Sequence, residues 1–303
     1  MNYKTILKNR STRYKVLAKL NWVPDSIMLR LQYRLKMGSW PNFRNPLRFT
    51  EKIQLYKMYY HNPIMSLCVD KYEVRHYVEQ KGLGDILNKC FGVYQNADDI
   101  DWDSLPNTFV MKKTTGGGGL NVAIVRDKST HNMDFLRKQA RWWTRPRSNN
   151  KSGGREWAYE GLSNNRVVFE KLLVDDNSVE SSLVDFKFFC FNGIPHCIQV
   201  DSDRQNNHHQ NYYDIDWNPL GVYCSYEQGE LVRKPDNFEQ MLEVARTLSE
   251  DFPFVRVDLY NVNGVIVFGE LTFYPSSGYG RFHPDSFDFE LGKAFDHRSF
   301  IER

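Results

Sequence analysis

Residues 254–272 have the sequence FVRVDLYNVNGVIVFGELT. Two apolar runs are joined by the turn-forming segment Asn261–Gly264, a pattern that predicts a β-hairpin. Asp258 lies in the first predicted strand and Glu270 in the second. Carboxylates rarely enter such apolar strands unless another charge compensates them. A divalent cation shared by the pair is one solution. The alternatives are an ion pair with Arg256 or a strand face that is solvated.

A second informative segment lies upstream, where a predicted strand at 109–113 leads into TTGGGGLN at 114–121 and a further strand at 122–125. Glycines without a Cβ can approach a ligand closely, and their amides can bind an anion beside Lys112. The residue order of a P-loop is absent, and a strand follows where a dinucleotide fingerprint needs a helix. A flexible hairpin tip is the alternative for the glycines alone. Lysine, glycine loop and distant acidic pair together predict a nucleoside triphosphate with magnesium.

Beyond these two motifs, segments from about residue 30 to the C-terminus resemble the TupA-like ATP-grasp family of bacterial surface-polysaccharide biosynthesis. The matching segments are 45–52, 70–75, 109–121, 156–159, 168–173, 185–193, 214–217 and 256–278. The resemblance implies an α+β ATP-grasp fold in three parts. These are a helical, basic region (1–106), a β-rich lid subdomain (107–174) and a C-terminal α+β subdomain (175–303). The nucleotide is expected between the last two.

The resemblance also implies which residues contact ATP. Lys112 corresponds to the lysine that reaches the phosphates, while the glycine loop covers them. An apolar strand and the residues that follow it would receive the adenine, although an ordinary core strand is the alternative. The expected nucleotide contacts are Lys112, Gly116, Gly117, Gly118, Phe169, Glu170, Leu172 and Leu173.

For the metal, the resemblance implies that Asp258 and Glu270 bind Mg²⁺. Thr272 stands where most members of the ATP-grasp superfamily have an asparagine as third ligand. A neutral hydroxyl is a weaker oxygen donor, so the number of metal ions is left open. Ser276, Ser277 and Gly278 form a small polar loop just beyond, where we expect the carboxylate of the acceptor.

Three basic residues are the expected catalytic groups. Lys187 shares a strand face with Asp185, near the position of the transferring phosphate. Arg204 and Arg256 are candidates for stabilising an acyl-phosphate and the tetrahedral intermediate that follows, a role that suits a fixed, bidentate cation. Arg256 also shares a strand face with Asp258, which permits a simple salt bridge. The mechanism needs no protein nucleophile.

The expected reaction is therefore an ATP-dependent ligation of a carboxylate to an amine through an acyl-phosphate. The expected substrates are a uronic acid of a bacterial surface polysaccharide, or of its precursor, and an amino acid or other amine. A glycosyltransferase is the main rival, because Asp201-x-Asp203 follows an apolar run and resembles a motif that binds a metal and a nucleotide sugar. A non-catalytic glycan-binding protein rich in tyrosine and tryptophan ranks last, because it leaves Asp258 and Glu270 without a role.

Charge is distributed unevenly along the chain of 303 residues. Residues 1–60 contain thirteen Lys or Arg and two Asp or Glu, whereas the net charge of the whole chain is +3. Helical spacing of apolar residues in this segment predicts a basic helical arm. Such an arm is typical of contact with polyanions, an anionic membrane or a lipid-linked glycan, and a solvated helical face is the alternative. No nucleic-acid-binding signature accompanies the charge, so nucleic acid is not an expected partner.

The expected cellular location of the protein follows from its apolar segments and its cysteines. No apolar run approaches the ~20 residues needed to span a bilayer, and the first residues lack the apolar core of a signal peptide. The five cysteines have no CxxC spacing and are expected to be free thiols. We therefore expect a cytoplasmic protein, with peripheral contact at the inner face of the plasma membrane.

Overall fold

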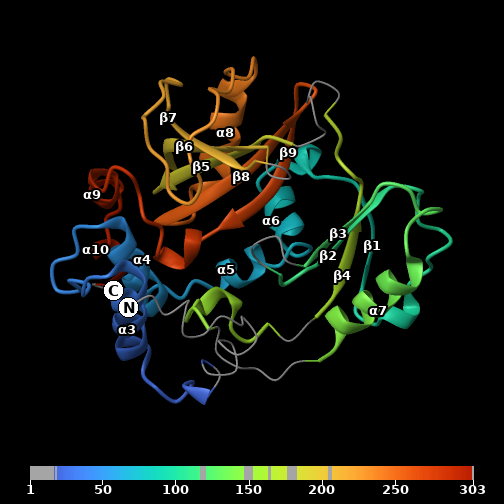
Figure 1. Ribbon diagram of the computed structural model, residues 1–303, viewed down its shortest axis with the longest axis horizontal. Coiled ribbons are helices and arrows are strands. Elements are labelled where there is room, and N and C mark those ends of the chain that lie inside the picture. Colours follow the sequence, from blue (N-terminus) through green and yellow to red (C-terminus); the bar gives the residue numbers. More distant parts are fainter. Residues whose placement is uncertain are drawn as a thin grey trace.

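Two antiparallel sheets organise the computed structural model of the protein, and helices surround them (Figure 1). The predicted α+β fold class is confirmed. The structure describes residues 17, 19–116, 121–146, 153–162, 165–175, 183–203 and 207–301.

The larger sheet has five strands in the order β7-β6-β5-β8-β9. The predicted hairpin at its edge is confirmed, and Asn263 and Gly264 take the left-handed conformation that a tight hairpin turn requires. The strands are β5 (Asp185–Phe191), β6 (Ile194–Ser202), β7 (His209–Asp214), β8 (Phe254–Val262) and β9 (Val265–Thr272).

Eight α-helices are distributed along the described part of the chain. They are α3 (Asp25–Met37), α4 (Phe49–Tyr59), α5 (Pro63–Cys68), α6 (Val74–Gln80), α7 (Met133–Thr144), α8 (Phe238–Ser249), α9 (Ser286–Ala294) and α10 (Arg298–Ile301). The short 3₁₀ helices are η1 (Gly84–Ile86), η2 (Ala97–Asp99), η3 (Trp157–Tyr159) and η4 (Pro275–Gly278). Among the described residues, no helix is both long and apolar enough to cross a membrane.

The two faces of the five-stranded sheet have different partners. Phe188 packs against Phe238 of α8 on one face, whereas Phe189 packs against Phe49 of α4 on the other. Neighbouring residues of a strand point to opposite faces, so Lys187 shares the face of Phe189. This face therefore has an aromatic core at one end and charged side chains at the other.

The smaller sheet has four strands in the order β1-β4-β2-β3. Its strands are β1 (Cys90–Tyr94), β2 (Phe109–Lys113), β3 (Val122–Val125) and β4 (Val167–Glu170). The strands expected at 109–113 and 122–125 are confirmed, and α7 packs on the outer side of this sheet (Figure 1). β1 lies within the region 1–106 that we expected to be helical, so this sheet begins earlier in the chain than residue 107.

The start of α4 is held by the carboxylates of Glu51 and Asp288, and Asp288 accepts from the backbone amide of Thr50. Glu51, in the first turn of the helix, accepts hydrogen bonds from the backbone amides of Asn42, Leu47 and Arg48. These bonds satisfy amides at the helix start and hold the preceding loop against the helix. Lys52 of the same turn donates to two carbonyl oxygens at the end of α9, which joins the two helices.

This junction of α4 and α9 yields a testable prediction. A Cβ atom added at Gly292 would overlap the carbonyl oxygen of Leu47. The backbone at Leu47 would have to move to relieve this overlap. Gly292→Ala should therefore lower the free energy of unfolding by about 1–3 kcal/mol in urea denaturation. Gly84→Ala is the matched control, since its Cβ would make only an ordinary contact with the Glu79 side chain. Equal stability of the two variants would contradict this packing.

Candidate functional site

A cavity of about 560 Å³ lies between the two sheets. Residues of β2, β3 and β4 line it on one side, and residues of β5, β8 and β9 line it on the other. The segment between α5 and α6 contributes at the end of the cavity. The charged residues that line it include Lys71, Arg75, Lys112, Arg126, Glu170, Asp185, Lys187, Arg256, Asp258 and Glu270.

The two carboxylates of the predicted hairpin are cross-strand partners. Asp258 of β8 lies opposite Glu270 of β9, next to an irregularity in the strand register. A Cβ atom at Gly269 would come within 2.8 Å of the Asp258 carbonyl oxygen, so a glycine is required for this close approach. The sequence pattern therefore identified a real pair of neighbouring carboxylates.

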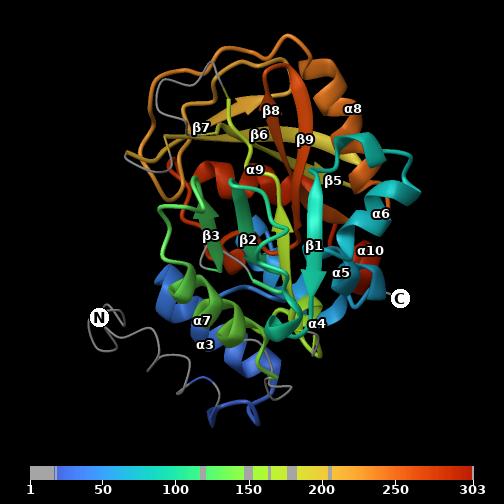
Figure 2. The same cartoon turned by 90° about the vertical axis from the view of Figure 1, so that its right-hand side faces the viewer.

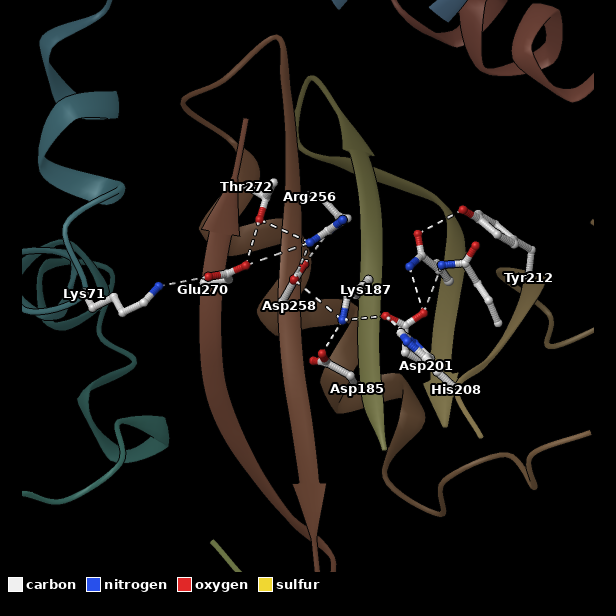
Figure 3. Close-up of polar contacts among 12 residues, drawn as sticks. Lys71, Asp185, Lys187, Asp201, His208, Tyr212, Arg256, Asp258, Glu270 and Thr272 are labelled. Atoms are coloured by element: carbon white, nitrogen blue, oxygen red, sulfur yellow. Dashed lines mark hydrogen bonds and ion pairs between the residues drawn. The ribbon is translucent and has the colours of Figure 1, made fainter. Parts of the chain in front are cut away.

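Arg256 is the immediate partner of Asp258 (Figure 3). Its Nε and Nη2 atoms donate to the two carboxylate oxygens at 2.7 and 2.6 Å, and Nη2 also donates to the Thr272 hydroxyl at 3.2 Å. Burial raises the pKa of Asp258 to about 6, although Arg256 and Lys187 oppose that shift. The ion pair that was one alternative for Asp258 thus exists, and Glu270 lies beside it.

Lys187 connects this pair to two further carboxylates. Its ammonium group contacts Asp185 on the same strand and lies 3.2 Å from Asp201 and 3.9 Å from Asp258. Burial opposes the charged form, but the surrounding carboxylates raise the pKa of Lys187 above its usual value. Lys187 is therefore a charged residue in the middle of the site, on the strand face where we expected it.

Asp201 is engaged on all sides by the protein. In addition to Lys187, it accepts hydrogen bonds from the side-chain amides of Gln199 and Gln210, at 2.9 and 3.1 Å. Burial would raise its pKa, but Lys187 and the amides lower the pKa to about 2. Asp203 lies beyond the end of β6 and accepts from the backbone amide of Asn207. Within the described residues, no group of three His, Cys, Asp or Glu side chains could hold a metal ion.

Lys71 is the cation that the sequence analysis missed. Its ammonium group lies 3.1 Å from Glu270, and its backbone amide donates to the carbonyl of Thr114, at the start of the glycine-loop segment. Burial raises the pKa of Glu270, but Lys71 and Arg256 lower it to about 2. Segment 70–75 was among those that resembled the family, and this was the available signal. Nothing in the sequence placed Lys71 beside Glu270.

On the side of the four-stranded sheet, Lys112 extends into the cavity, and its ammonium group lies 2.6 Å from a carboxylate oxygen of Glu170. Gly116 and the two leucines Leu172 and Leu173 also line the cavity. Three residues of the predicted site, Gly117, Gly118 and Arg204, lie outside the described residues.

The expectation for Phe169 needs correction. Its side chain is buried in the core of the four-stranded sheet, where it packs against Tyr94, Trp102 and Phe109. Side chains alternate between the faces of β4, so Glu170 points to the cavity and Phe169 points away from it. The apolar character of β4 reflects this core and does not by itself indicate an adenine site.

The loop expected to bind the acceptor follows β9 as η4. Ser276 and Ser277 both have positive φ angles, of 49° and 55°, which is unusual for residues with a side chain. Ser276 and Gly278 line a second, small cavity of about 40 Å³, and Arg256 lines both cavities. Ser277 instead accepts hydrogen bonds from the buried ammonium group of Lys57 on α4.

The charge balance tests whether this site suits a metal ion. Four carboxylates of the sheet face pair with three cations, which leaves one excess negative charge. The carboxylates are Asp185, Asp201, Asp258 and Glu270, and the cations are Lys71, Lys187 and Arg256. Carboxylate and hydroxyl oxygens are ligands that Mg²⁺ accepts, and Mg²⁺ is commonly held by one or two carboxylates plus phosphate oxygens. The donor set Asp258, Glu270 and Thr272 fits that pattern. Lys112, Arg75 and Arg126 line the same cavity and suit phosphate groups.

Comparison with known proteins identifies the family of the chain. The sequence matches the family model described as TupA-like ATPgrasp over residues 51–296. No curated protein matches the sequence.

Several solved structures resemble the fold at low sequence identity. D-alanine–D-alanine ligase from Bacillus anthracis is 16% identical, with a TM-score of 0.44 over 68% of this chain and 57% of that chain. The ADP complex of PurK, N5-carboxyaminoimidazole ribonucleotide synthetase, is 14% identical, with a TM-score of 0.44 over 68% and 45%. The ATP-grasp ligase PsnB, with minimal precursor, Mg and ADP, is 13% identical, with a TM-score of 0.37 over 70% and 52%. The chain spans about half the length of these proteins.

Lys57 yields a prediction about pH. Burial lowers its pKa to about 7, although the nearby Glu156 opposes the shift. The unfolded chain, in which lysine has a pKa of about 10.4, then binds more protons than the native state between about pH 7 and 10. The free energy of unfolding of the native protein should therefore rise over this range relative to Lys57→Met, by about 4 kcal/mol, since each pKa unit corresponds to about 1.4 kcal/mol.

The measurement is urea denaturation of both proteins at several pH values, with Lys138→Met on the exposed side of α7 as the control. Parallel pH profiles would contradict the shift. They would mean that the carbonyl and hydroxyl acceptors around Lys57 keep it charged in the native state.

Proposed function

Because this chain belongs to the TupA-like ATP-grasp family, we propose that it is an ATP-dependent carboxylate–amine ligase. The observation that carries the proposal is the cavity between the two sheets, which has basic side chains on the side of the four-stranded sheet and a pair of carboxylates on the other. Its volume of about 560 Å³ lies within the range of ~300–1,000 Å³ that is usual for small-molecule sites.

The orientation of ATP in this proposal follows from the chemistry of the cavity walls. Leu172 and Leu173 offer an apolar surface to the adenine, and the chain that follows β4 offers backbone hydrogen-bonding groups. Lys112 binds the phosphates from the lid. Lys71 lies at the opposite side of the cavity, beside Glu270, and binds the phosphate end that is nearest to the metal.

Asp258, Glu270 and Thr272 would hold Mg²⁺. When bound, Mg²⁺ neutralises phosphate charge and orients the γ-phosphate for transfer. In the ion pairs of this structure, Arg256 and Lys71 occupy the carboxylate oxygens that a metal needs. We therefore propose that both cations turn toward the substrate phosphates when the metal is present.

The proposed reaction has two steps. A carboxylate oxygen of the acceptor attacks the γ-phosphorus, which forms an acyl-phosphate and releases ADP. The amine nitrogen then attacks the acyl carbon, inorganic phosphate leaves, and the nitrogen loses a proton as the amide forms. Arg256 stabilises the negative charge of the acyl-phosphate and of the tetrahedral intermediate, and Lys187 supports it from the adjacent strand. Positioning and charge stabilisation supply the catalysis.

We propose that the carboxylate belongs to a uronic acid of a bacterial surface polysaccharide, or of its precursor, and that the amine is an amino acid or a related compound. The resemblance to the family supports this choice of substrates. The polar residues around the small cavity below Arg256, among them Ser276, suit a carboxylate or a hydroxyl group. We place the protein in the cytoplasm, where ATP is available.

The rival proposal, a glycosyltransferase that uses Asp201 and Asp203, has less support. Asp201 is held by Lys187 and two side-chain amides, so a metal ion would have to displace three partners. It also leaves the carboxylate pair on β8 and β9 without a role.

A first prediction concerns ATP binding. Saturating Mg-ATP should raise the melting temperature of the protein, because a ligand present at ~100 times its Kd stabilises the native state by about 2.7 kcal/mol. Lys112→Ala should lose most of this shift, whereas Lys138→Ala on the outer side of α7 should retain it. A full shift in Lys112→Ala would remove Lys112 from the nucleotide site. The absence of any shift in the unmodified protein would count against the proposed function.

A second prediction concerns turnover. ADP release with Mg-ATP, a uronate and a panel of amino acids should fall on the order of a hundredfold or more in Asp258→Asn and in Glu270→Gln, because the metal loses a charged ligand. Asp201→Asn should lose less activity, since Asp201 supports Lys187 and would not bind the metal. If turnover survives both carboxylate substitutions, the metal assignment is wrong.

A further inference from the structure

We propose that α3 is a docking surface for an anionic lipid membrane. The sequence predicted a basic helical arm within residues 1–60, of which residues 1–16 and 18 lie outside the described residues and α3 is a described part. Ile27, Leu31 and Leu35 are spaced four residues apart, so they form one row along the helix. Each is about half exposed, at 50%, 45% and 56%.

Two tryptophans extend this apolar row at the two ends of the helix. Trp22 precedes α3 and is 80% exposed, and Trp40 follows it and is 61% exposed. Tryptophan is enriched at membrane interfaces because it combines an apolar ring with a polar N–H group. Single exposed apolar residues need no explanation, but a helical row of three, with an exposed tryptophan just before the helix and another just after it, indicates a surface that binds something apolar.

Positive charge adjoins the row and decides between the possible occupants. Arg30 and Arg34 lie on the same exposed side of α3, and Lys19 and Arg44 are exposed nearby in the chain. Asp25, the single acidic residue of the helix, forms an ion pair with Arg155 on the protein side. Apolar residues beside arginines, with no exposed unpaired carboxylate on the helix, suit an anionic lipid headgroup region. A second copy of this face would instead bring like charges together.

The opposite face of α3 connects this surface to the proposed acceptor loop. Tyr279 directly follows η4 and donates a hydrogen bond to Gln32, and Gln32 donates to the carbonyl of Gly153. The guanidinium group of Arg281 donates to the carbonyl of Lys36 near the end of the helix. A membrane bound to the outer face of α3 would therefore lie close to the loop that we propose for the acceptor. This part of the inference rests on the proposed function, and it points to an acceptor that is carried on a lipid.

Other exposed apolar side chains do not have these properties. Phe135 and Trp142 are exposed on α7, but carboxylates lie among them, and Asp134 and Asp98 pair with the arginines of that helix. Val265 is 60% exposed at the β8–β9 turn, which lies at the opposite end of the molecule from α3 (Figure 1; Figure 2). Val265 therefore provides a matched control for an apolar substitution.

The test is co-sedimentation of the full chain with phosphatidylcholine vesicles, with and without phosphatidylglycerol. We expect binding to the vesicles that contain phosphatidylglycerol, weakened by added salt. Leu31→Ser should reduce the partition coefficient about tenfold, and Arg34→Ala should reduce it about fivefold, which corresponds to ~1 kcal/mol for each basic residue at the surface. Val265→Ser should bind like the unmodified protein.

The outcomes separate this inference from the proposed function. The thermal shift with Mg-ATP should be the same in all these variants, so failure to bind vesicles with an intact ATP shift would overturn only the docking surface. Binding that is unchanged in both α3 variants would also overturn it. The docking surface would also be wrong if a soluble uronic-acid polymer displaced the protein from the vesicles and Leu31→Ser did not change vesicle binding. That result would indicate a site for polyanions in general. If the protein self-associates without lipid and Leu31→Ser abolishes this self-association, the face binds a second copy of the chain instead.

Discussion

The site depends on charge compensation on one face of the five-stranded sheet. Asp258 is 2% exposed, and a buried carboxylate without a partner costs several kcal/mol. Arg256 and Lys187 supply the compensating charge, and each of them contacts more than one acidic residue. The same contacts constrain the strand register. A slip by one residue would turn Lys187 and Arg256 toward α8 and bring apolar side chains such as Phe188 to the cavity face.

This constraint explains why one sheet combines a rigid core with a reactive site. The strands that carry Lys187 and Arg256 continue into an aromatic cluster at their other end, where Phe189, Phe191 and Phe254 pack against α4 and α9. Core packing fixes the backbone, and the backbone fixes the spacing of the charged groups. Because the strand backbone is already held in place, only the side chains of Arg256 and Lys71 have to turn in the proposed mechanism.

The cavity joins parts of the chain that are far apart in the sequence. Lys71 comes from the helical N-terminal part, Lys112 from the four-stranded sheet and Glu270 from the five-stranded sheet. Lys71 touches two of these parts, since its side chain pairs with Glu270 and its backbone bonds to Thr114. Arg166, near the start of β4, adds ion pairs to Asp70 and Glu73 in the same segment. The connection between α5 and α6 therefore links the four-stranded sheet to the carboxylate pair.

The sequence by itself determined the local features of this protein. The hairpin at 254–272, the strands on both sides of the glycine run and the pairing of Asp258 with Glu270 depend on turn residues and on alternation, which act over a few residues. Only the tertiary structure decided which long-range partners meet. The contact of Lys71 with Glu270 spans 199 residues, and no local pattern encodes it. Which side of β4 faces the cavity was also decided only by the tertiary structure. An apolar strand next to a cavity contains both lining and core residues, and only the packing of Phe169 against Trp102 shows which is which.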